Sequence, residues 1–322
     1  EAVFEDTEVK EKATKKAQSF LDKDVIFATN TSTLPITKLA EASLSKNDFI
    51  GIHFFSPVHK MNLVEIIKGE KTGDKAVATA LDFVKRIRKT PIVVNDARFF
   101  YANRCIIPYI NEGVRMVGEG VEPAMVENAA KQLGMPVGPL QLIDETSIDL
   151  GLRIAKETQE ALGNAYEGGP TDEVLKVLAD AGRLGRKSNA GFYSYNEKGK
   201  REEIWRGLRD HWEPKIPQPD FNDVKNRLAM IQAVEAVKAL EENVLTDIRE
   251  GDVGAVLGWG CMPWAGGPFS WLDLIGVSEA ENICASLVKK YGNRFLAPEL
   301  LRDLSDKKET FYNRFPKGQT NL

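Results

Sequence analysis

The chain has 322 residues, of which 43% are hydrophobic and 28% are charged, and its formal net charge is -4. This composition is typical of a globular protein with enough apolar residues for two or three domains. A weakly negative chain offers no basic surface for nucleic acid or anionic lipid, and no apolar run reaches membrane-spanning length. We therefore expect neither a nucleic-acid partner nor a membrane span.

The three cysteines, Cys105, Cys261 and Cys284, are widely spaced and lie in apolar helical patterns. Such cysteines suit a reducing compartment better than a disulfide framework. The charged opening does not have the pattern of a signal peptide. The sequence therefore predicts a cytoplasmic protein with free thiols, and we predict no metal site.

The first 97 residues predict an α/β domain. They open with what reads as the exit of a strand and continue into an amphipathic helix, with Val9, Ala13, Ala17 and Leu21 on its apolar face. The following expected elements are a strand at 24–30, a turn and helix at 31–44, strands at 48–55 and 63–69, a helix at 73–89 and a strand at 90–96. Strands that are apolar on both faces and alternate with helices indicate a parallel, doubly wound sheet.

From residue 98 the pattern is helical and contains an internal repeat. Residues 103–120 match residues 226–243 at an offset of 123, and "GPLQLID" at 138–144 matches "GPFSWLD" at 267–273. Residues 197–221 are charged and contain three prolines, as a linker or surface crossing would. The sequence thus predicts two related helical units, at 98–197 and 198–322.

Two polar residues, His53 and Glu65, lie twelve residues apart in otherwise apolar strands. A buried polar side chain costs free energy unless it is paired. A carboxylate on the adjacent strand would orient the imidazole and stabilise its cation, and imidazole titrates nearest to neutral pH. We therefore predict that they form an acid–base pair. His59 and His211 have no carboxylate at such a spacing, and we interpret them as core residues without a chemical role.

Several motifs resemble, in order along the chain, the L-3-hydroxyacyl-CoA dehydrogenases: "NTST", "HFFSPV", "LVEIIKG", an Asn-Arg at a helix start, "GMPVGPLQLID" and "GRKSNAGFY". The duplicated helical unit and the ending "YGNRFLAPELLRDL…FY" resemble the dehydrogenase half of bacterial multifunctional fatty-acid oxidation enzymes, which carry an enoyl-CoA hydratase domain upstream. The resemblance covers essentially the whole chain. It implies a Rossmann-like, NAD-binding domain and NAD-dependent oxidation of L-3-hydroxyacyl-CoA to 3-ketoacyl-CoA in β-oxidation.

The resemblance also implies roles for individual residues. His53 would be the general base and Glu65 its orienting partner, Ser32 would lie between the nicotinamide and the substrate oxygen, and Asn103 would bind the substrate near the reacting carbonyl. Ser32 and Asn103 also lie near expected helix starts, where capping is the alternative role. Asn226 corresponds to Asn103 in the repeat, and we expect it only to cap its helix.

Three further residues match positions near the cofactor in the family. Glu5 and Lys10 match residues that touch the ribose and the nicotinamide, although charges that open a helix are more often simply solvated. Ser56 stands where many relatives have Asn near the nicotinamide. Residues 98–100, Arg-Phe-Phe, replace the more usual Pro-Gly-Phe, and this departure would reshape the hinge between domains.

One expected motif is not found in these 322 residues: no G-x-G-x-x-G follows a strand and opens a helix. That loop brings main-chain N–H groups and a helix N-terminus to the pyrophosphate of a dinucleotide. We therefore expect residues 1–97 to be the C-terminal part of a dinucleotide-binding domain. We also expect the chain on its own neither to bind NAD tightly nor to oxidise 3-hydroxyacyl-CoA.

Two other function classes stay open. One alternative is a catalytically inert module that dimerises or docks a thiolase. The other is a dehydrogenase that acts on another hydroxy acid, such as a sugar acid. The His-Glu spacing favours the acyl-CoA enzyme over the latter, whose relatives more often use a lysine base. The partners that we expect are an acyl-CoA substrate, a second copy in a homodimer, and a thiolase subunit.

Overall fold

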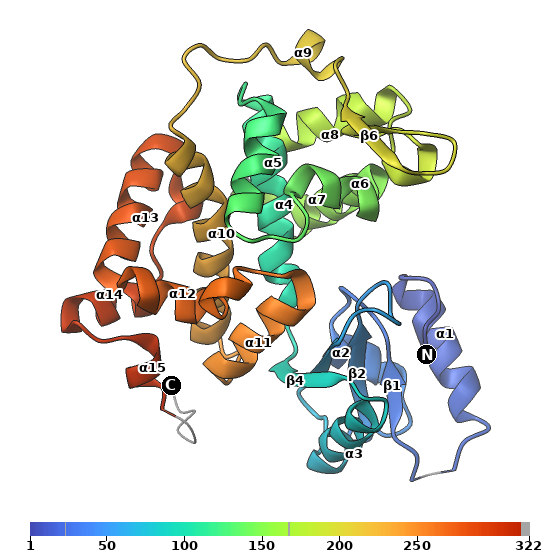
Figure 1. Cartoon of the computed structure of the whole chain (residues 1–322). Coiled ribbons are helices and arrows are strands. Elements are labelled where there is room, and N and C mark those ends of the chain that lie inside the picture. Colours follow the sequence, from blue (N-terminus) through green and yellow to red (C-terminus); the bar gives the residue numbers. More distant parts are fainter. Residues whose placement is uncertain (23, 167, 317–322) are drawn as a thin grey trace. The chain divides into compact units, whose positions relative to one another are not determined.

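The structure is a computed structural model and describes residues 1–22, 24–166 and 168–316 (Figure 1). The chain divides into two compact units, the first with residues 1–106, 233–288 and those from 295 on, the second with residues 107–232 and 289–294. The boundary between the units falls within two long helices, α4 (Ala102–Gly118) and α10 (Phe221–Glu241). No helix in the described ranges is both long and apolar enough to cross a bilayer.

The first unit contains a four-stranded sheet with the order β1-β2-β3-β4. Its strands are β1 (Phe27–Thr29), β2 (Phe49–Phe54), β3 (Leu63–Lys68) and β4 (Thr90–Asn95). The pairs β1–β2 and β3–β4 are parallel, whereas β2–β3 is antiparallel. The predicted Rossmann-like fold class is confirmed, except that β3 and β4 both run antiparallel to β1 and β2. Residues 55–62 are too short a connection for a parallel crossover, so the chain returns in the antiparallel direction.

The two faces of this sheet carry different residues because side chains alternate along each strand. On one face, Ile52 and Ile66 pack against Ala80 of α3 (Asp74–Arg86), which covers that face in Figure 1. His53 and Glu65 lie on the opposite face. On the same face, a Cβ atom at Gly51 would lie 2.7 Å from Ile36 of α2 (Ile36–Leu39), which the turn η1 (Ala40–Ala42) extends.

Helix α1 (Thr7–Gln18) forms where a helix was predicted, but its predicted buried face is wrong. Val9 and Leu21 are 41% and 43% exposed, and the buried side chains are polar: Lys10, Thr14 and Gln18. The two longer side chains, Lys10 and Gln18, have polar partners, and these permit their burial. The Gln18 amide, for example, donates to the Ser43 hydroxyl at 2.8 Å and accepts the Leu44 N–H.

The rest of the chain is mainly helical, as predicted, with one unpredicted hairpin. The helices are α5 (Pro123–Gln132), α6 (Pro139–Thr146), α7 (Ile148–Leu162), α8 (Pro170–Asp180), α9 (Leu208–His211), α11 (Ile248–Trp259), α12 (Pro268–Ile275), α13 (Val277–Tyr291), α14 (Glu299–Lys307) and α15 (Phe311–Arg314). Short 3-10 turns are η2 (Gly163–Ala165), η3 (Arg186–Ser188), η4 (Pro263–Ala265) and η5 (Asn293–Phe295). The antiparallel strands β5 (Tyr193–Tyr195) and β6 (Arg201–Ile204) form the hairpin, partly within the predicted linker.

The internal repeat appears in the structure as a repeated hydrogen-bond pattern around a buried carboxylate. In the first copy, Glu127 accepts the main-chain N–H of Leu140 at 2.8 Å and the Tyr193 hydroxyl at 2.8 Å. In the second copy, Asp252 accepts the N–H of Phe269 at 2.8 Å and the Tyr312 hydroxyl at 2.9 Å. In both, the carboxylate lies at the N-terminus of the next helix, where the helix dipole favours an anion.

A second pair of carboxylates repeats in the same way. Asp144 accepts the N–H groups of Phe192 and Tyr193, at 2.8 and 2.9 Å. Asp273 accepts those of Phe311 and Tyr312, at 2.8 and 3.0 Å. The two copies are therefore held by the same polar contacts, although their helices differ in length.

Three pairs of equivalent residues form ion pairs reciprocally between the two copies. Arg104 contacts Glu235 at 3.3 Å and Glu242 at 2.6 Å, and Arg227 contacts Glu112 at 2.6 Å and Glu119 at 2.8 Å. Each residue of the second set lies 123 positions from its counterpart in the first. Such an exchange, in which residue i of one copy meets residue j of the other and the reverse, is the pattern of an isologous contact.

Helix α11 of the second copy packs on the sheet, beside the strands that carry the predicted pair. Glu250 accepts the N–H of Val93 at 2.8 Å, and the Val244 carbonyl accepts that of Asn95 at 2.8 Å. A Cβ atom at Gly254 would lie 2.7 Å from Ile92, so the glycine allows the helix to approach β4 closely. These contacts satisfy main-chain groups along the edge of β4, which would otherwise be open to another strand.

Candidate active site

His53 and Glu65 lie directly opposite each other on the antiparallel strands β2 and β3. The imidazole Nδ1 is 2.8 Å from Oε2 of Glu65, and the two residues are 4% and 0% exposed. The polar residues that interrupt the two apolar strands therefore satisfy each other. The predicted pair is brought together inside the protein, where a hydrogen bond between charged or polar groups is less screened by water.

The other carboxylate oxygen of Glu65 is held by the beginning of α4. Oε1 accepts the main-chain N–H of Tyr101 at 3.1 Å and that of Ala102 at 2.9 Å. Two N–H donors at a helix N-terminus stabilise a carboxylate anion. An ionised carboxylate only accepts hydrogen bonds, so with Glu65 in that form Nδ1 of His53 is the donor, and a neutral imidazole then has its lone pair on Nε2. The arrangement can orient an imidazole that acts as a base through Nε2.

Aromatic rings border His53. The centroid of the Phe55 ring lies 4.5 Å from that of the imidazole, and the centroid of Phe100 lies 6.1 Å away. Phe99 and Phe100 have φ angles of 66° and 52°, in the left-handed region that residues other than glycine rarely adopt. Each such residue costs about 1–3 kcal/mol, so the surrounding contacts must hold this loop in place.

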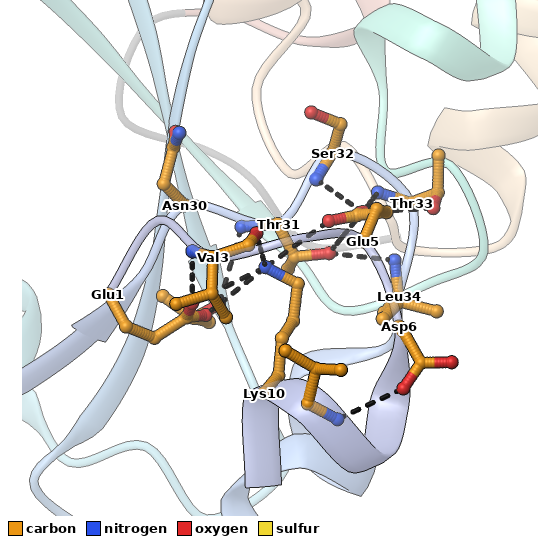
Figure 2. Close-up of polar contacts among 12 residues, drawn as sticks. Glu1, Val3, Glu5, Asp6, Lys10, Asn30, Thr31, Ser32, Thr33 and Leu34 are labelled. Atoms are coloured by element: carbon orange, nitrogen blue, oxygen red, sulfur yellow. Dashed lines mark hydrogen bonds and ion pairs between the residues drawn. The ribbon is translucent and has the colours of Figure 1, made fainter. Parts of the chain in front are cut away.

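Ser32 and Asn103, which the sequence predicts to bind substrate, also come together. The Asn103 side-chain amide donates to the main-chain carbonyl of Ser32 at 2.8 Å. The Ser32 hydroxyl points away from the Glu5 carboxylate in Figure 2 and has no hydrogen-bond partner among residues 1–22, 24–166 and 168–316. It lies in the loop after the carboxyl end of β1, the edge of an open α/β sheet at which ligands bind.

Glu5 and Lys10 are not the solvated charges that the start of a helix more often carries. The Glu5 carboxylate accepts the Thr31 hydroxyl at 2.6 Å and the N–H groups of Ser32 and Thr33, each at 2.9 Å (Figure 2). Burial opposes the ionisation of Glu5, but these hydrogen bonds and the Lys10 ammonium, at 3.2 Å, together lower the pKa of its carboxyl. Glu5 therefore fixes the loop that carries Ser32.

Four other predicted residues lie apart from these contacts. Ser56 is exposed, and no hydrogen bond links it to the predicted site residues within the described ranges. His59 and His211 are exposed too, so their interpretation as core residues is wrong. Asn226 lies inside α10, five positions after its first residue, so the prediction that it caps the helix is wrong as well.

The main-chain N–H groups of Tyr101 and Ala102 are functional groups that the sequence did not reveal. A main-chain donor has no residue-type signature, and only the start of α4 places these two at Glu65. The one available signal was indirect. A buried carboxylate needs partners for both oxygens, and His53 supplies only one of them.

The residues around Ser32 fit one end of a dinucleotide. The half-buried Ser32 and the loop after β1 form the kind of strand-end site at which the nicotinamide half would bind in a doubly wound sheet. Glu5 bonds to this loop and Lys10 pairs with Glu5, so Glu5 holds the loop directly and Lys10 acts on it only through Glu5. A buried His–Glu pair on an α/β sheet, together with a polar loop at a strand end, is typical of an α/β oxidoreductase.

Comparisons with known proteins identify the family. Residues 1–97 match the sequence model for the 3-hydroxyacyl-CoA dehydrogenase NAD-binding domain, and residues 100–195 match that for the C-terminal domain. The (S)-3-hydroxybutyryl-CoA dehydrogenase PaaH1 from Ralstonia eutropha is 34% identical over 61% of this chain and 69% of its own, with a TM-score of 0.57. The chain therefore belongs to the 3-hydroxyacyl-CoA dehydrogenase family, whose NAD-dependent members are oxidoreductases.

Two more distant structures share the fold over almost the whole chain. The 3-hydroxybutyryl-CoA dehydrogenase from Escherichia coli K12 is 22% identical, with coverage of 95% of this chain and 80% of its own and a TM-score of 0.78. The dehydrogenase part of multifunctional enzyme 1 from C. elegans is 24% identical, with coverage of 94% and 70% and a TM-score of 0.65. The similarity thus extends beyond residue 195 into the second copy of the helical unit.

Proposed function

We propose that this chain carries the reaction centre of an NAD-dependent L-3-hydroxyacyl-CoA dehydrogenase of fatty-acid β-oxidation, with His53 as the general base. One observation carries the proposal. A buried imidazole is held by a carboxylate whose second oxygen is fixed by the start of a helix, so that Nε2 remains available as a base. Oxidation of a secondary alcohol requires a group of this kind.

In the proposed reaction, Nε2 of His53 takes the proton of the 3-hydroxyl group as the carbonyl forms. Bound NAD would supply the hydride acceptor for the carbon that carries this hydroxyl group. Glu65 keeps the proton on Nδ1 and stabilises the imidazolium produced, as a buried aspartate does in serine proteases. In the reverse direction, His53 returns the proton to the oxygen of the 3-ketoacyl thioester.

The other predicted residues divide between substrate and cofactor. We assign the Ser32 hydroxyl to the space between the substrate oxygen and the nicotinamide, and Asn103 to the orientation of the substrate near its reacting carbonyl. Ser56 would contact the nicotinamide side from the loop after β2. Glu5 would act on the cofactor through the loop that it holds, and Lys10 through its ion pair with Glu5, because the polar atoms of both already have partners within the protein.

The test is a set of variants in the natural protein that contains this chain, assayed with acetoacetyl-CoA and NADH. His53→Ala should lower kcat by roughly 10²–10⁴, the usual contribution of a positioned general base, and should leave KM little changed. Glu65→Gln should also lose much of the rate, because a neutral partner does not stabilise the imidazolium. His59→Ala, at an exposed histidine, is the matched control and should retain full activity. A kcat for His53→Ala within threefold of wild type would remove the assignment.

The domain organisation and the assembly partners belong to the same proposal. We propose an NAD-binding segment at 1–97, a first helical unit at 98–197 and a second at 198–322. A homodimer and a docked thiolase subunit remain predictions for the chain. Sedimentation velocity of the purified protein, alone and with a thiolase subunit, would measure both associations.

A further inference from the structure

We infer that Tyr101 is a positioning residue for the reaction, because its phenol anchors the start of α4, which holds Glu65, to helix α11 of the second helical copy. The inference rests on the proposed roles of His53 and Glu65. It concerns a residue that neither the motifs nor the comparisons single out. It also gives the second copy a part in the reaction without contact with substrate.

The main-chain N–H and the side-chain hydroxyl of Tyr101 bond to different parts of the protein. Its main-chain N–H donates to Oε1 of Glu65 at 3.1 Å, and its side-chain hydroxyl donates to the main-chain carbonyl of Gly251 in α11 at 3.0 Å. The residue is 0% exposed. Burial raises the pKa of the Tyr101 phenol well above its ordinary value, so the hydroxyl keeps its proton and remains a donor. One side chain therefore ties the Glu65 clamp to a separate helix.

Helix α11 is suited to serve as this anchor. The Tyr101 ring packs edge-on against Trp259, with ring centroids 5.7 Å apart. A Cβ at Gly254 would lie 2.7 Å from Ile92 and 3.5 Å from the Tyr101 ring, so the helix lies close to both. Ile92 is the register partner of Glu65 on β4. The same helix thus contacts Tyr101 and the strand next to the carboxylate.

The loop before Tyr101 explains why an anchor is needed. Phe99 and Phe100, both at positive φ, directly precede it. A non-glycine residue at positive φ persists only when its surroundings hold it. Release of the tyrosine hydroxyl would let this segment relax, and the N–H groups of Tyr101 and Ala102 would move away from Glu65. Glu65 would then hold the Nδ1 proton of His53 less firmly.

The chain supplies a matched control on the same helix. Tyr109 is also 0% exposed, and its hydroxyl also donates to a main-chain carbonyl, that of Val137, at 3.0 Å. Tyr101→Phe and Tyr109→Phe therefore delete the same atom and the same type of bond. Only the first deletion affects the segment that holds Glu65.

The experiment compares the two variants by a spectroscopic and a kinetic readout. The chain has three histidines, so the Nδ1–H proton resonance of His53 can be assigned by NMR with His53→Gln as the blank. This readout needs no cofactor. Tyr101→Phe should shift or broaden that resonance and lower kcat roughly threefold to tenfold, as expected for the loss of a neutral hydrogen bond, with KM unchanged. Tyr109→Phe should leave both readouts at wild-type values.

The outcomes separate this inference from the proposed function. If Tyr101→Phe matches Tyr109→Phe in both readouts, Tyr101 has only a structural role and the inference is wrong, while an inactive His53→Ala still supports the proposed base. If His53→Ala stays active, the proposed function itself fails. Should Tyr101→Phe not fold, Gly254→Ala becomes the decisive variant. The added methyl group would collide with Ile92 and displace α11 from β4 and Tyr101, so it should change the His53 resonance in the same way. An unchanged resonance would overturn the inference.

Discussion

The two copies of the helical unit share their internal contacts and differ at the start of their first helix. Each copy has a buried carboxylate, Glu127 or Asp252, that accepts hydrogen bonds from a main-chain N–H at a helix N-terminus and from a tyrosine hydroxyl. Helix α4 of the first copy begins at Ala102, so its first N–H groups are free to hold Glu65. Helix α10 of the second copy begins five residues before Asn226.

This difference shows that packing and chemistry depend on different features of the same repeat. The carboxylate contacts require only that the helices meet in the same way, and both copies satisfy that requirement. The contact with Glu65 requires a helix that begins at one particular residue. In the second copy the extra turn gives the equivalent N–H groups helical partners, and α11 contributes instead by packing on the sheet.

The largest difference between the copies should appear when each loses its reciprocal arginine. Arg227 is 1% exposed and pairs with two carboxylates, whereas Arg104 is 14% exposed and one of its partners, Glu242, is 57% exposed. Arg227→Met should lower the free energy of unfolding by about 3 kcal/mol, because the buried Glu112 loses one of its two arginine partners and keeps only Arg294, at 2.7 Å. Arg104→Met should cost about 1 kcal/mol, since its partner Glu242 is largely accessible to water and Glu235 keeps a second cation, that of Lys238. Urea denaturation measures both, and equal losses would contradict the asymmetry.

The sequence predicted those features that depend on residue type along one segment. The strands of the sheet and the His53–Glu65 pair followed from apolar runs and from the polar residues within them. The polar buried face of α1 did not, because its burial depends on partners such as residues 43–44, distant in sequence. The start of α10 was also missed, since Asn226 resembles a capping residue and nothing local excludes five more helical residues before it.

A second difference between the copies concerns pH. Asp144 is 1% exposed, and burial raises its pKa from 3.8 to about 6 in spite of three hydrogen bonds. Burial also raises the pKa of Asp273, which is only half-buried. A carboxyl whose pKa is higher in the folded than in the unfolded state stabilises the fold fully below about pH 4, and this contribution falls as the pH rises to about 6.

The contribution of Asp144 should therefore depend on pH more than that of Asp273. The destabilisation caused by Asp144→Ala should be larger at pH 4 than at pH 7, by roughly 2–3 kcal/mol. For Asp273→Ala the same difference should be smaller. Denaturant titrations at the two pH values measure both quantities. A destabilisation by Asp144→Ala that grows with pH would mean that the three donors hold the anion and that the pKa is lowered.

The smallest expected effects concern the two asparagines, which compare the helix starts directly. Asn103 lies in the first turn of α4, and its amide donates to the Ser32 carbonyl, whereas Asn226 lies within α10. Asn103→Ala should lower kcat/KM about tenfold, the size of one lost hydrogen bond that orients reacting groups. Asn226→Ala should leave kcat/KM unchanged and alter the free energy of unfolding by less than about 0.7 kcal/mol, because alanine is the better helix former. Equal kinetic losses in both variants would mean that the second copy reaches the reaction centre through α10 as well as through α11.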